Sequence, residues 1–380
     1  MTVTEVVFWS SMMLTGYAYF GYPLLLWTLS LVRACEVRKG GITPSVTFIV
    51  TAFNEEKRIL EKLDNTLKLS YPSGLLEIIV ASDCSSDRTD DLVKSYESRG
   101  VKLIRSTQRK GKEAAQKLAV ESAGGDILIF SDVATILSET AITSIVKNFH
   151  DPTVGCVSSE DRFVAIDGRA SGEGAYVKYE MLLRSLESRV NSLVGLSGSF
   201  FAARASVCKA RWSEELQSDF STVLNSMRMG LRGVADPDSI GIYKNIADEQ
   251  KEYERKVRTV LRGISVFMRS WELVNPLRYP IFAWQLVSHK LCRWLVPFAM
   301  MTALLSNVVL AAGSATYTLL LLGQVIFYGI AVGGVLIKPL LKLALVRLLS
   351  FFLVVNISIL LAWIRYWNGE RLVAWEPSKR

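Results

Sequence analysis

The sequence predicts an α/β fold built on a doubly wound, mainly parallel sheet, with apolar helices at both ends of the chain. Between residues 46 and 149, short apolar runs alternate with amphipathic helical stretches, a pattern typical of parallel strands joined by helices. The run Ile127–Phe130 is apolar at every position, as expected for a strand buried on both faces. The longest apolar stretches lie near the two ends of the chain, which is 50% hydrophobic overall.

The spacing of apolar residues, with the residues that begin and end each run, predicts the individual elements. Strands are expected over Val46–Thr51, Leu76–Ala81, Val101–Arg105, Ile127–Asp132, Val154–Ser159 and the end of the glycine-serine stretch Gly195–Arg204. Helices are expected from Ser86 or Asp87 to Arg99, and over Lys112–Ala123, Ser138–Phe149, Gly174–Asn191, Asp219–Leu231 and Ala247–Met268. Asn54 is expected to cap a further helix, with Glu55 and Glu56 in its first turn. Gly100 and Gly124 end two of these helices.

Charge and cysteine content narrow the classes of function. The net charge is +8, but basic residues flank the apolar stretches, where they set membrane orientation and meet anionic lipid. The sequence has no zinc-finger spacing and no basic-aromatic RNA motif, so we expect no nucleic-acid partner. The five cysteines are scattered and there are two histidines. This argues against a Cys/His metal site and fits a reducing compartment.

The N-terminal apolar stretch predicts a membrane anchor. Val6–Val32 has no charged residue and is long enough to span a bilayer. It is too long for the apolar core of a signal peptide and lacks a cleavage pattern. Arg33, Arg38 and Lys39 follow it, which places the middle of the chain on the cytoplasmic side by the positive-inside tendency.

The C-terminal third predicts three further spans. Trp294–Ala312, Thr316–Ile337 and Leu343–Ile364 each have about 20 residues, the length of a span. The uncharged loop 312–315 is expected to face outward. With the N-terminal anchor, three spans leave the basic tail outside, so either one stretch does not span or the positive-inside tendency fails here. The expected domains are an anchor (1–33), a cytoplasmic α/β domain (34–270), an interfacial segment (271–292), the spans (293–367) and a basic tail (368–380).

Polar residues gather where the predicted parallel strands end. Asn54-Glu55, Asp83, Lys112 and Asp132 all follow strands whose connections reach the same edge of the sheet, so we expect them in one crevice. A carboxylate such as Asp132 can hold a divalent cation, and the cation can hold a diphosphate. Taken alone, Asp132 could instead make turn hydrogen bonds, and Lys112 could be a solvated lysine at a helix start.

These residues carry a family resemblance. The motifs TAFNE (51–55), SDCSSDRT (82–89), KGK (110–112) and SD (131–132), in this order, resemble those of the family 2 inverting glycosyltransferases. The membrane-anchored plan is similar to that family's polysaccharide synthases. The resemblance covers nearly the whole chain and implies the GT-A fold, a Rossmann-like nucleotide-sugar domain.

The resemblance implies transfer of a sugar from a UDP-sugar to a glycan or lipid-linked acceptor, with inversion. It implies cell-surface or exopolysaccharide synthesis at the cytoplasmic face of a plasma membrane, the inner membrane of a bacterium. The implied uridine-binding residues are Thr51, Ala52, Asn54, Glu55 and Asp83. Lys112 would balance the diphosphate charge, Asp132 would meet Mg²⁺ or Mn²⁺, and Asp219 would deprotonate the acceptor hydroxyl. Without the resemblance, Asp219 could equally be the N-cap of its own helix.

The chain departs from the family pattern at several positions. Ala134 stands where a second metal-facing polar residue is usual, so the metal would be held by Asp132, diphosphate and water, which magnesium tolerates. Ser218 replaces the usual acidic neighbour of the base. Processive synthases of the family carry Gln-x-x-Arg-Trp, and the comparable place here is 255–259, without the tryptophan.

For one pair of basic residues and one pair of acidic residues, the sequence leaves alternatives open. Arg255 and Arg258, one helical turn apart, could grip a diphosphate or a lipid phosphate, or form a basic stripe on a helix that lies along the membrane. Glu160-Asp161 could supply a carboxylate or be solvated loop acids. The departures at Ala134, Ser218 and Thr259 also favour a second interpretation, a catalytically inactive nucleotide-binding subunit that assembles with partner subunits in a synthase complex.

Overall fold

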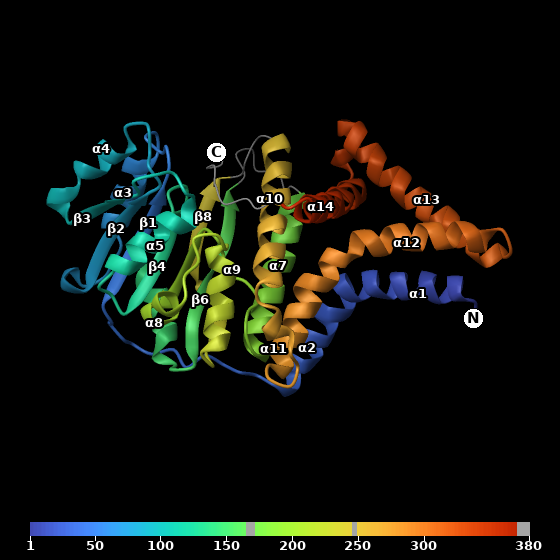
Figure 1. Ribbon diagram of the computed structural model, residues 1–380, viewed down its shortest axis with the longest axis horizontal. Coiled ribbons are helices and arrows are strands. Elements are labelled where there is room, and N and C mark those ends of the chain that lie inside the picture. The colour runs from blue at the N-terminus through green and yellow to red at the C-terminus, as the bar shows by residue number, and fades with distance from the viewer. Residues whose placement is uncertain (165–171, 245–248, 371–380) are drawn as a thin grey trace.

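The structure is a computed structural model, and it describes residues 1–164, 172–244 and 249–370. Figure 1 shows a sheet covered by helices, joined to a group of long apolar helices at the opposite end of the molecule. Within the described residues, eight strands form one sheet in the order β3-β2-β1-β4-β7-β6-β8-β5. Their bounds are β1 Val46–Ala52, β2 Leu76–Ser82, β3 Val101–Arg105, β4 Ile127–Asp132, β5 Ile136–Leu137, β6 Val154–Val164, β7 Phe200–Arg204 and β8 Arg232–Lys244.

The first half of the sheet is parallel and the second half is mixed. β1 pairs in parallel with β2 and β4, and β2 pairs in parallel with β3. β7 is antiparallel to both β4 and β6, whereas β6 and β8 run parallel to one another. The α/β fold class is therefore confirmed. The connections of the parallel half place the loops after β1, β2 and β4 at one edge.

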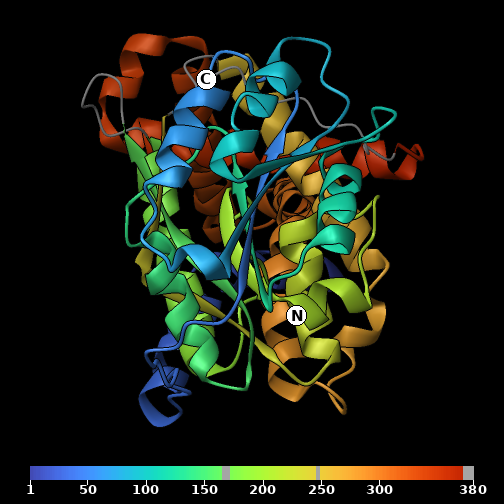
Figure 2. The same cartoon turned by 90° about the vertical axis from the view of Figure 1, so that its left-hand side faces the viewer.

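Helices cover both faces of the sheet and continue into the apolar group. Their bounds are α1 Val3–Gly16, α2 Tyr22–Val32, α3 Ile59–Leu67, α4 Thr89–Lys94, α5 Lys112–Ser122, α6 Ala141–Val146, α7 Gly172–Val190, α8 Ala205–Ala210, α9 Ser218–Arg228, α10 Glu249–Met268, α11 Pro280–Leu286, α12 Arg293–Ala311, α13 Ala315–Leu336 and α14 Ala344–Trp367. Figure 2 looks onto the β3 edge of the sheet, with helices on either side of the strands. Alternate residues of β1 point to the two faces, so Phe48 and Val50 join one hydrophobic core and Ile49 joins the other.

Two local predictions are wrong. Asn54 does not cap a helix, because α3 begins at Ile59. Asn54 instead adopts a left-handed conformation with φ of 51°, which asparagine tolerates, and its side-chain oxygen accepts from the backbone N–H of Ser86 at 2.8 Å. The predicted helix over 86–99 is split into α4 and a 3₁₀ turn at Glu97–Arg99, although it ends as expected at Gly100.

Three helices of the described chain are long and apolar enough to cross a membrane: Pro280–Ala311, Ala315–Leu336 and Ala344–Trp367. These helices indicate membrane association. The first of them begins at 280, because α11 runs through a π-helical turn into α12, so much of the expected interfacial segment belongs to this helix. The stretch α1–α2 is not one of the three, and its role as an anchor stays a prediction. α1 lies along α12, where Trp9 Nε1 donates to Tyr317 on α13 at 3.3 Å (Figure 1).

Candidate active site

The loops that carry the first two motifs are bound to one another. Glu55 N–H donates to Thr89 Oγ1 at 2.7 Å, and the contact of Asn54 with Ser86 joins the same two loops. Thr51 Oγ1 is buried and accepts from Gln116 at 3.1 Å. The carbonyl of Ala52 accepts from Asp83 N–H at 3.0 Å. The structure thus brings the predicted nucleotide-binding residues together at the edge of β1 and β2.

Asp83 anchors the KGK loop. Its carboxylate is fully buried, and its two oxygens accept from the backbone N–H groups of Lys110 and Gly111, each at 2.9 Å. Burial raises the pKa of Asp83, and the two backbone hydrogen bonds act in the opposite direction. The turn that precedes α5 is therefore fixed to the end of β2, and this places Lys112 at the start of α5. Contact of Asp83 with a uracil ring stays a prediction.

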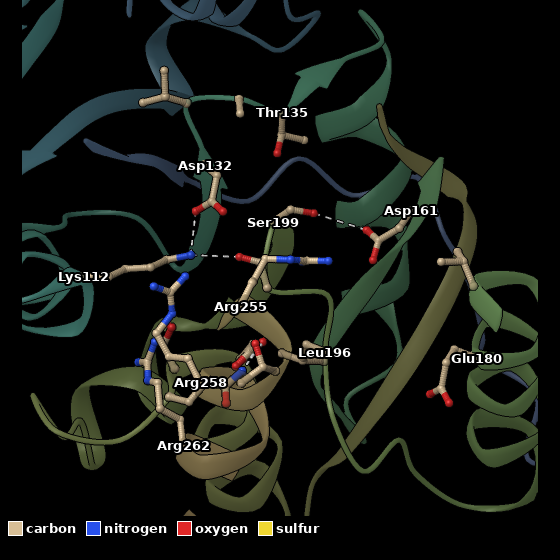
Figure 3. Close-up of a pocket in the computed structure, with 18 of the residues that line it drawn as sticks. Lys112, Asp132, Thr135, Asp161, Glu180, Leu196, Ser199, Arg255, Arg258 and Arg262 are labelled. Atoms are coloured by element: carbon tan, nitrogen blue, oxygen red, sulfur yellow. Dashed lines mark hydrogen bonds and ion pairs between the residues drawn. The ribbon is translucent and has the colours of Figure 1, made fainter. Parts of the chain in front are cut away.

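A cavity of about 400 Å³ lies beyond the ends of the central strands. Of the predicted site residues, the cavity is lined by Glu55, Lys112, Asp132, Asp219, Arg255 and Arg258. Thr51, Ala52, Asn54 and Asp83 lie outside its lining. Figure 3 shows that Lys112, Asp132 and the arginines of α10 face the same space. The predicted site residues thus fall into two groups, one at the ends of β1 and β2 and one around the cavity.

Lys112 joins Asp132 to the loop that precedes β7. Its Nζ lies 2.6 Å from Asp132 Oδ1 and 2.9 Å from the carbonyl oxygen of Gly198. Lys112 is buried, so the alternative of a solvated lysine is wrong. Asp132 keeps 27% of its side chain exposed at the cavity wall.

Asp219 lies in the first turn of α9 with its carboxylate against Gly198. Oδ1 accepts from the N–H of Phe220 at 2.8 Å, and Oδ2 accepts from Gln217 Nε2 at 3.0 Å. The N-cap position belongs to Gln217, so the interpretation of Asp219 as a cap is wrong. Burial raises the pKa of Asp219, while the charges of Lys112 and Arg262 act in the opposite direction. A carboxylate with a raised pKa that lines a cavity is suited to accept a proton.

Three arginines of α10 form one cationic wall. Arg255, Arg258 and Arg262 line the cavity and lie on the same side of it in Figure 3. Arg262 also forms an ion pair with Glu113, which is buried at the start of α5. Sequence reasoning missed Arg262 and Glu113, although Arg262 continues the helical row of Arg255 and Arg258 at the spacing of one turn.

The structure places Asp161 in a strand, whereas the sequence analysis allowed for a loop. It lies inside β6 rather than in a loop, and it lines the cavity. Its carboxylate accepts from Ser197 Oγ at 2.5 Å and from Ser199 Oγ at 3.3 Å, and Arg184 lies 3.6 Å away. The alternative of a solvated loop acid is therefore wrong for Asp161, because the extension of β6 beyond residue 159 carries it into the site.

The donor set at the end of β4 fits one hard divalent cation. Asp132 offers carboxylate oxygens to the cavity, and Ala134 offers none. Across the described ranges there is no group of three or more His, Cys, Asp or Glu that could hold a metal. Mg²⁺ is commonly bound by one or two carboxylates together with substrate phosphate and water. Asp132 alone therefore suits a metal that arrives with a diphosphate.

Comparisons with known proteins show the family and the fold of the chain. The model of glycosyl transferase family 2 matches residues 47–211. The poly-β-1,6-N-acetyl-D-glucosamine synthase of Staphylococcus aureus is 28% identical over 198 residues, 50% of this chain and 46% of the synthase, so the chain spans about half the length of that relative. An N-acetylglucosaminyltransferase of Bradyrhizobium elkanii is 32% identical over 126 residues, 32% of this chain and 68% of the relative.

A solved structure shows the same fold over nearly the whole chain. The mannosyltransferase PcManGT from Pyrobaculum calidifontis, in complex with GDP-Man and Mn²⁺, superposes with a TM-score of 0.75 at 24% identity. The match covers 97% of this chain and 100% of that one. The α/β domain thus has the GT-A fold, and the chain belongs to glycosyltransferase family 2.

Proposed function

We propose that this chain is an inverting glycosyltransferase that moves a sugar from a UDP-sugar to a hydroxyl group of a glycan or lipid-linked acceptor, in the synthesis of a cell-surface polysaccharide. The observation that carries the proposal is the position of Asp219. Its carboxylate lies in the wall of the cavity that Asp132 and Lys112 also line. One base on one side of a diphosphate site is what a single displacement with inversion requires.

The geometry suggests a role for each group. Asp219 accepts the proton of the acceptor hydroxyl as its oxygen bonds to the anomeric carbon. The bond from that carbon to the donor phosphate breaks, and its electron pair leaves with the diphosphate. Lys112, Arg255 and Arg258 stabilise the negative charge that develops there. A Mg²⁺ or Mn²⁺ ion on Asp132 would supply further charge neutralisation at the diphosphate.

The donor base and sugar are also proposals. The resemblance of the strand-end motifs supports UDP, whereas PcManGT was solved with GDP-Man. The names of the staphylococcal and Bradyrhizobium relatives both contain N-acetylglucosamine. We therefore take UDP-N-acetylglucosamine as the donor to test before UDP-hexoses and GDP-mannose.

The apolar helices support a membrane location for the transfer. We propose a multi-pass protein of the plasma membrane, the inner membrane of a bacterium, with the domain 34–270 on the cytoplasmic side, where nucleotide sugars are made. α10 contacts both α14 and α9, so the arginine wall lies between the sheet and an apolar helix (Figure 1). This position supports an acceptor or product that stays at the membrane.

The decisive experiment is UDP release by the full-length protein in detergent, with Mn²⁺ or Mg²⁺, across UDP-sugars and GDP-mannose. We expect release with one donor, and its loss in Asp219→Asn with nucleotide binding retained. Asp91→Asn is the matched control, because that aspartate is exposed on α4. Release that survives in Asp219→Asn would remove Asp219 as the base. Nucleotide binding with no release from any donor would favour the inactive subunit of a synthase complex.

A further inference from the structure

A lysine lies buried beneath the turn that carries Asp132. Lys62, on α3, has 0% of its surface exposed. Its Nζ donates to Ser131 Oγ and to the carbonyl oxygen of Thr135, each at 2.7 Å. Burial lowers the pKa of Lys62 to about 7, and the charge of Asp132 acts in the opposite direction. Lysine is almost never fully buried unless its ammonium group has partners, because moving the charge out of water costs free energy. An apolar residue at this position would avoid that cost.

Asn65, one helical turn further along α3, holds the same segment. Its Nδ2 donates to the carbonyl oxygen of Leu137 at 2.8 Å, and its Oδ1 accepts from the N–H of Leu137 at 3.0 Å. Residues three apart lie on one face of a helix. Lys62 therefore binds both ends of the turn 131–135, and Asn65 binds the chain just after it. Both side chains come from the same face of α3.

Other contacts also reach this turn. The N–H of Thr135 donates to the carbonyl oxygen of Asp132 at 3.2 Å, and the N–H of Asp132 donates to Ser199 at 3.0 Å. Ala134 supplies no polar side chain to this turn. A site with a single protein carboxylate depends on the orientation of that carboxylate. The backbone of the turn sets where the Asp132 side chain starts, and Lys112 binds its Oδ1 at 2.6 Å.

We propose that Lys62, together with Asn65, is a positioning residue that fixes the turn 131–135 so that Asp132 meets the metal and the donor diphosphate. The proposal rests on the proposed function. Lys62 is not among the residues that line the cavity, so it acts through Ser131 and Thr135 rather than on the substrate. Groups that hold a metal ligand in place typically change metal affinity or activity by about 10- to 100-fold when removed.

The experiment measures UDP binding by calorimetry at a series of Mn²⁺ concentrations. We expect Lys62→Met, which keeps most of the volume of the side chain, to raise the half-saturating Mn²⁺ concentration about 10-fold or more. Lys68→Met, at the exposed C-terminal end of the same helix, is the matched control. If Lys62→Met does not fold, Ser131→Ala removes one acceptor with little change in volume and should shift the same midpoint in the same direction.

A second readout uses the metal-free protein. Hydrogen exchange of the backbone amides at 131–137 should quicken in Lys62→Met and Asn65→Ala, while exchange at 83–87 stays unchanged. An unchanged Mn²⁺ midpoint together with unchanged exchange would overturn the proposal. If the wild-type protein itself shows no metal-dependent UDP binding, the metal site of the proposed function is wrong, and the exchange measurement alone decides whether α3 holds the turn.

Discussion

Because Gly198 has no side chain, the carboxylate of Asp219 fits against its backbone. A Cβ atom at residue 198 would lie 2.8 Å from Asp219 Oδ2, a distance at which something must move. The carbonyl oxygen of the same glycine accepts from Lys112 Nζ. One small residue thus positions both the proposed base and Lys112, which we propose to face the diphosphate. A change there tests the geometry without removing either group.

We expect Gly198→Ala to lower kcat about 10-fold or more, because a misplacement of about 1 Å at a reacting group can cost about 100-fold in rate. The KM for the donor should change little, since the strand-end loops that we propose to bind the nucleotide are not touched. Steady-state kinetics measure both constants. Gly74→Ala is the control, as no heavy atom lies within 4 Å of the added Cβ. A variant with unchanged kcat would contradict the role of Asp219.

The raised pKa of Asp219 predicts a pH dependence. Only the ionised carboxylate of Asp219 can take the proton of the acceptor's hydroxyl group. The kcat should therefore fall as the pH drops through the pKa of Asp219. Because burial raises the pKa, the acid limb should lie above the ~3.9 of an unperturbed aspartate. A profile of kcat against pH at saturating donor and acceptor measures the limb. Constant kcat down to about pH 4 would argue against a buried carboxylate as the base.

Sequence reasoning could name residues that follow predicted strands, but it missed Lys62 and Glu113. Asp83, Lys112 and Asp132 follow strands with clear patterns, and the fold brings the ends of such strands together. Lys62 and Glu113 lie in helical stretches, where a charged residue ordinarily predicts exposure. Their burial depends on which loop or helix covers that face, and no local pattern records this.

At the scale of elements, the parallel half of the sheet was predictable because each strand is mainly apolar and bounded by turn residues. β8, over Arg232–Lys244, was not predicted. It contains Pro237 and many polar residues, and it is a strand because it pairs with the distant β6. The cap at Asn54 was wrong for a similar reason, since its oxygen is bound by the loop after β2 rather than by its own helix.

The pair of Arg262 and Glu113 joins α10 to the start of α5, next to Lys112. Glu113 is buried, and the Arg262 side chain is 12% exposed. Removing one partner leaves the other charge buried, so Arg262→Gln should lower the free energy of unfolding by about 3 kcal/mol. The double variant with Glu113→Gln should lose less than the sum of the two single changes.

Denaturant unfolding of the full-length protein in detergent measures this loss. Arg269→Gln, directly after the end of α10, is the control, because the pair of Arg269 with Glu215 is about half exposed on both sides. Exposed pairs of this kind contribute roughly 0 to 1 kcal/mol. Equal effects of the two arginine variants would show that the α5–α10 pair is not a buried, coupled contact.

Across the whole molecule, the sheet domain and the apolar helices share one hydrophobic core. The cluster that contains Phe130 on β4 extends through α10 to Trp294 on α12 and Trp363 on α14. Trp363 Nε1 donates to the carbonyl oxygen of Trp294 at 3.0 Å. The arginine wall is therefore built on a helix whose other side packs against a candidate span, so the site and the membrane helices form one structural unit.

The turn between α12 and α13 gives a test of orientation for the whole molecule. In Figure 1 this turn lies at the end of the molecule away from the sheet, and the helices on either side are both long enough to cross a bilayer. If the sheet domain is cytoplasmic, the turn lies on the outer face. A cysteine introduced by Ser314→Cys should then react in intact cells with a thiol reagent that does not cross membranes.

The native cysteines supply the internal control. Cys84 lies at the strand-end loops and is partly exposed, so it should react only after the cells are opened, and the wild-type protein should stay unlabelled until then. Labelling of the wild-type protein in intact cells, with Ser314→Cys adding nothing before lysis, would place the sheet domain outside. The nucleotide-sugar donor could then not reach the cavity from the cytoplasm, and the proposed cytoplasmic location of the sheet domain would be wrong.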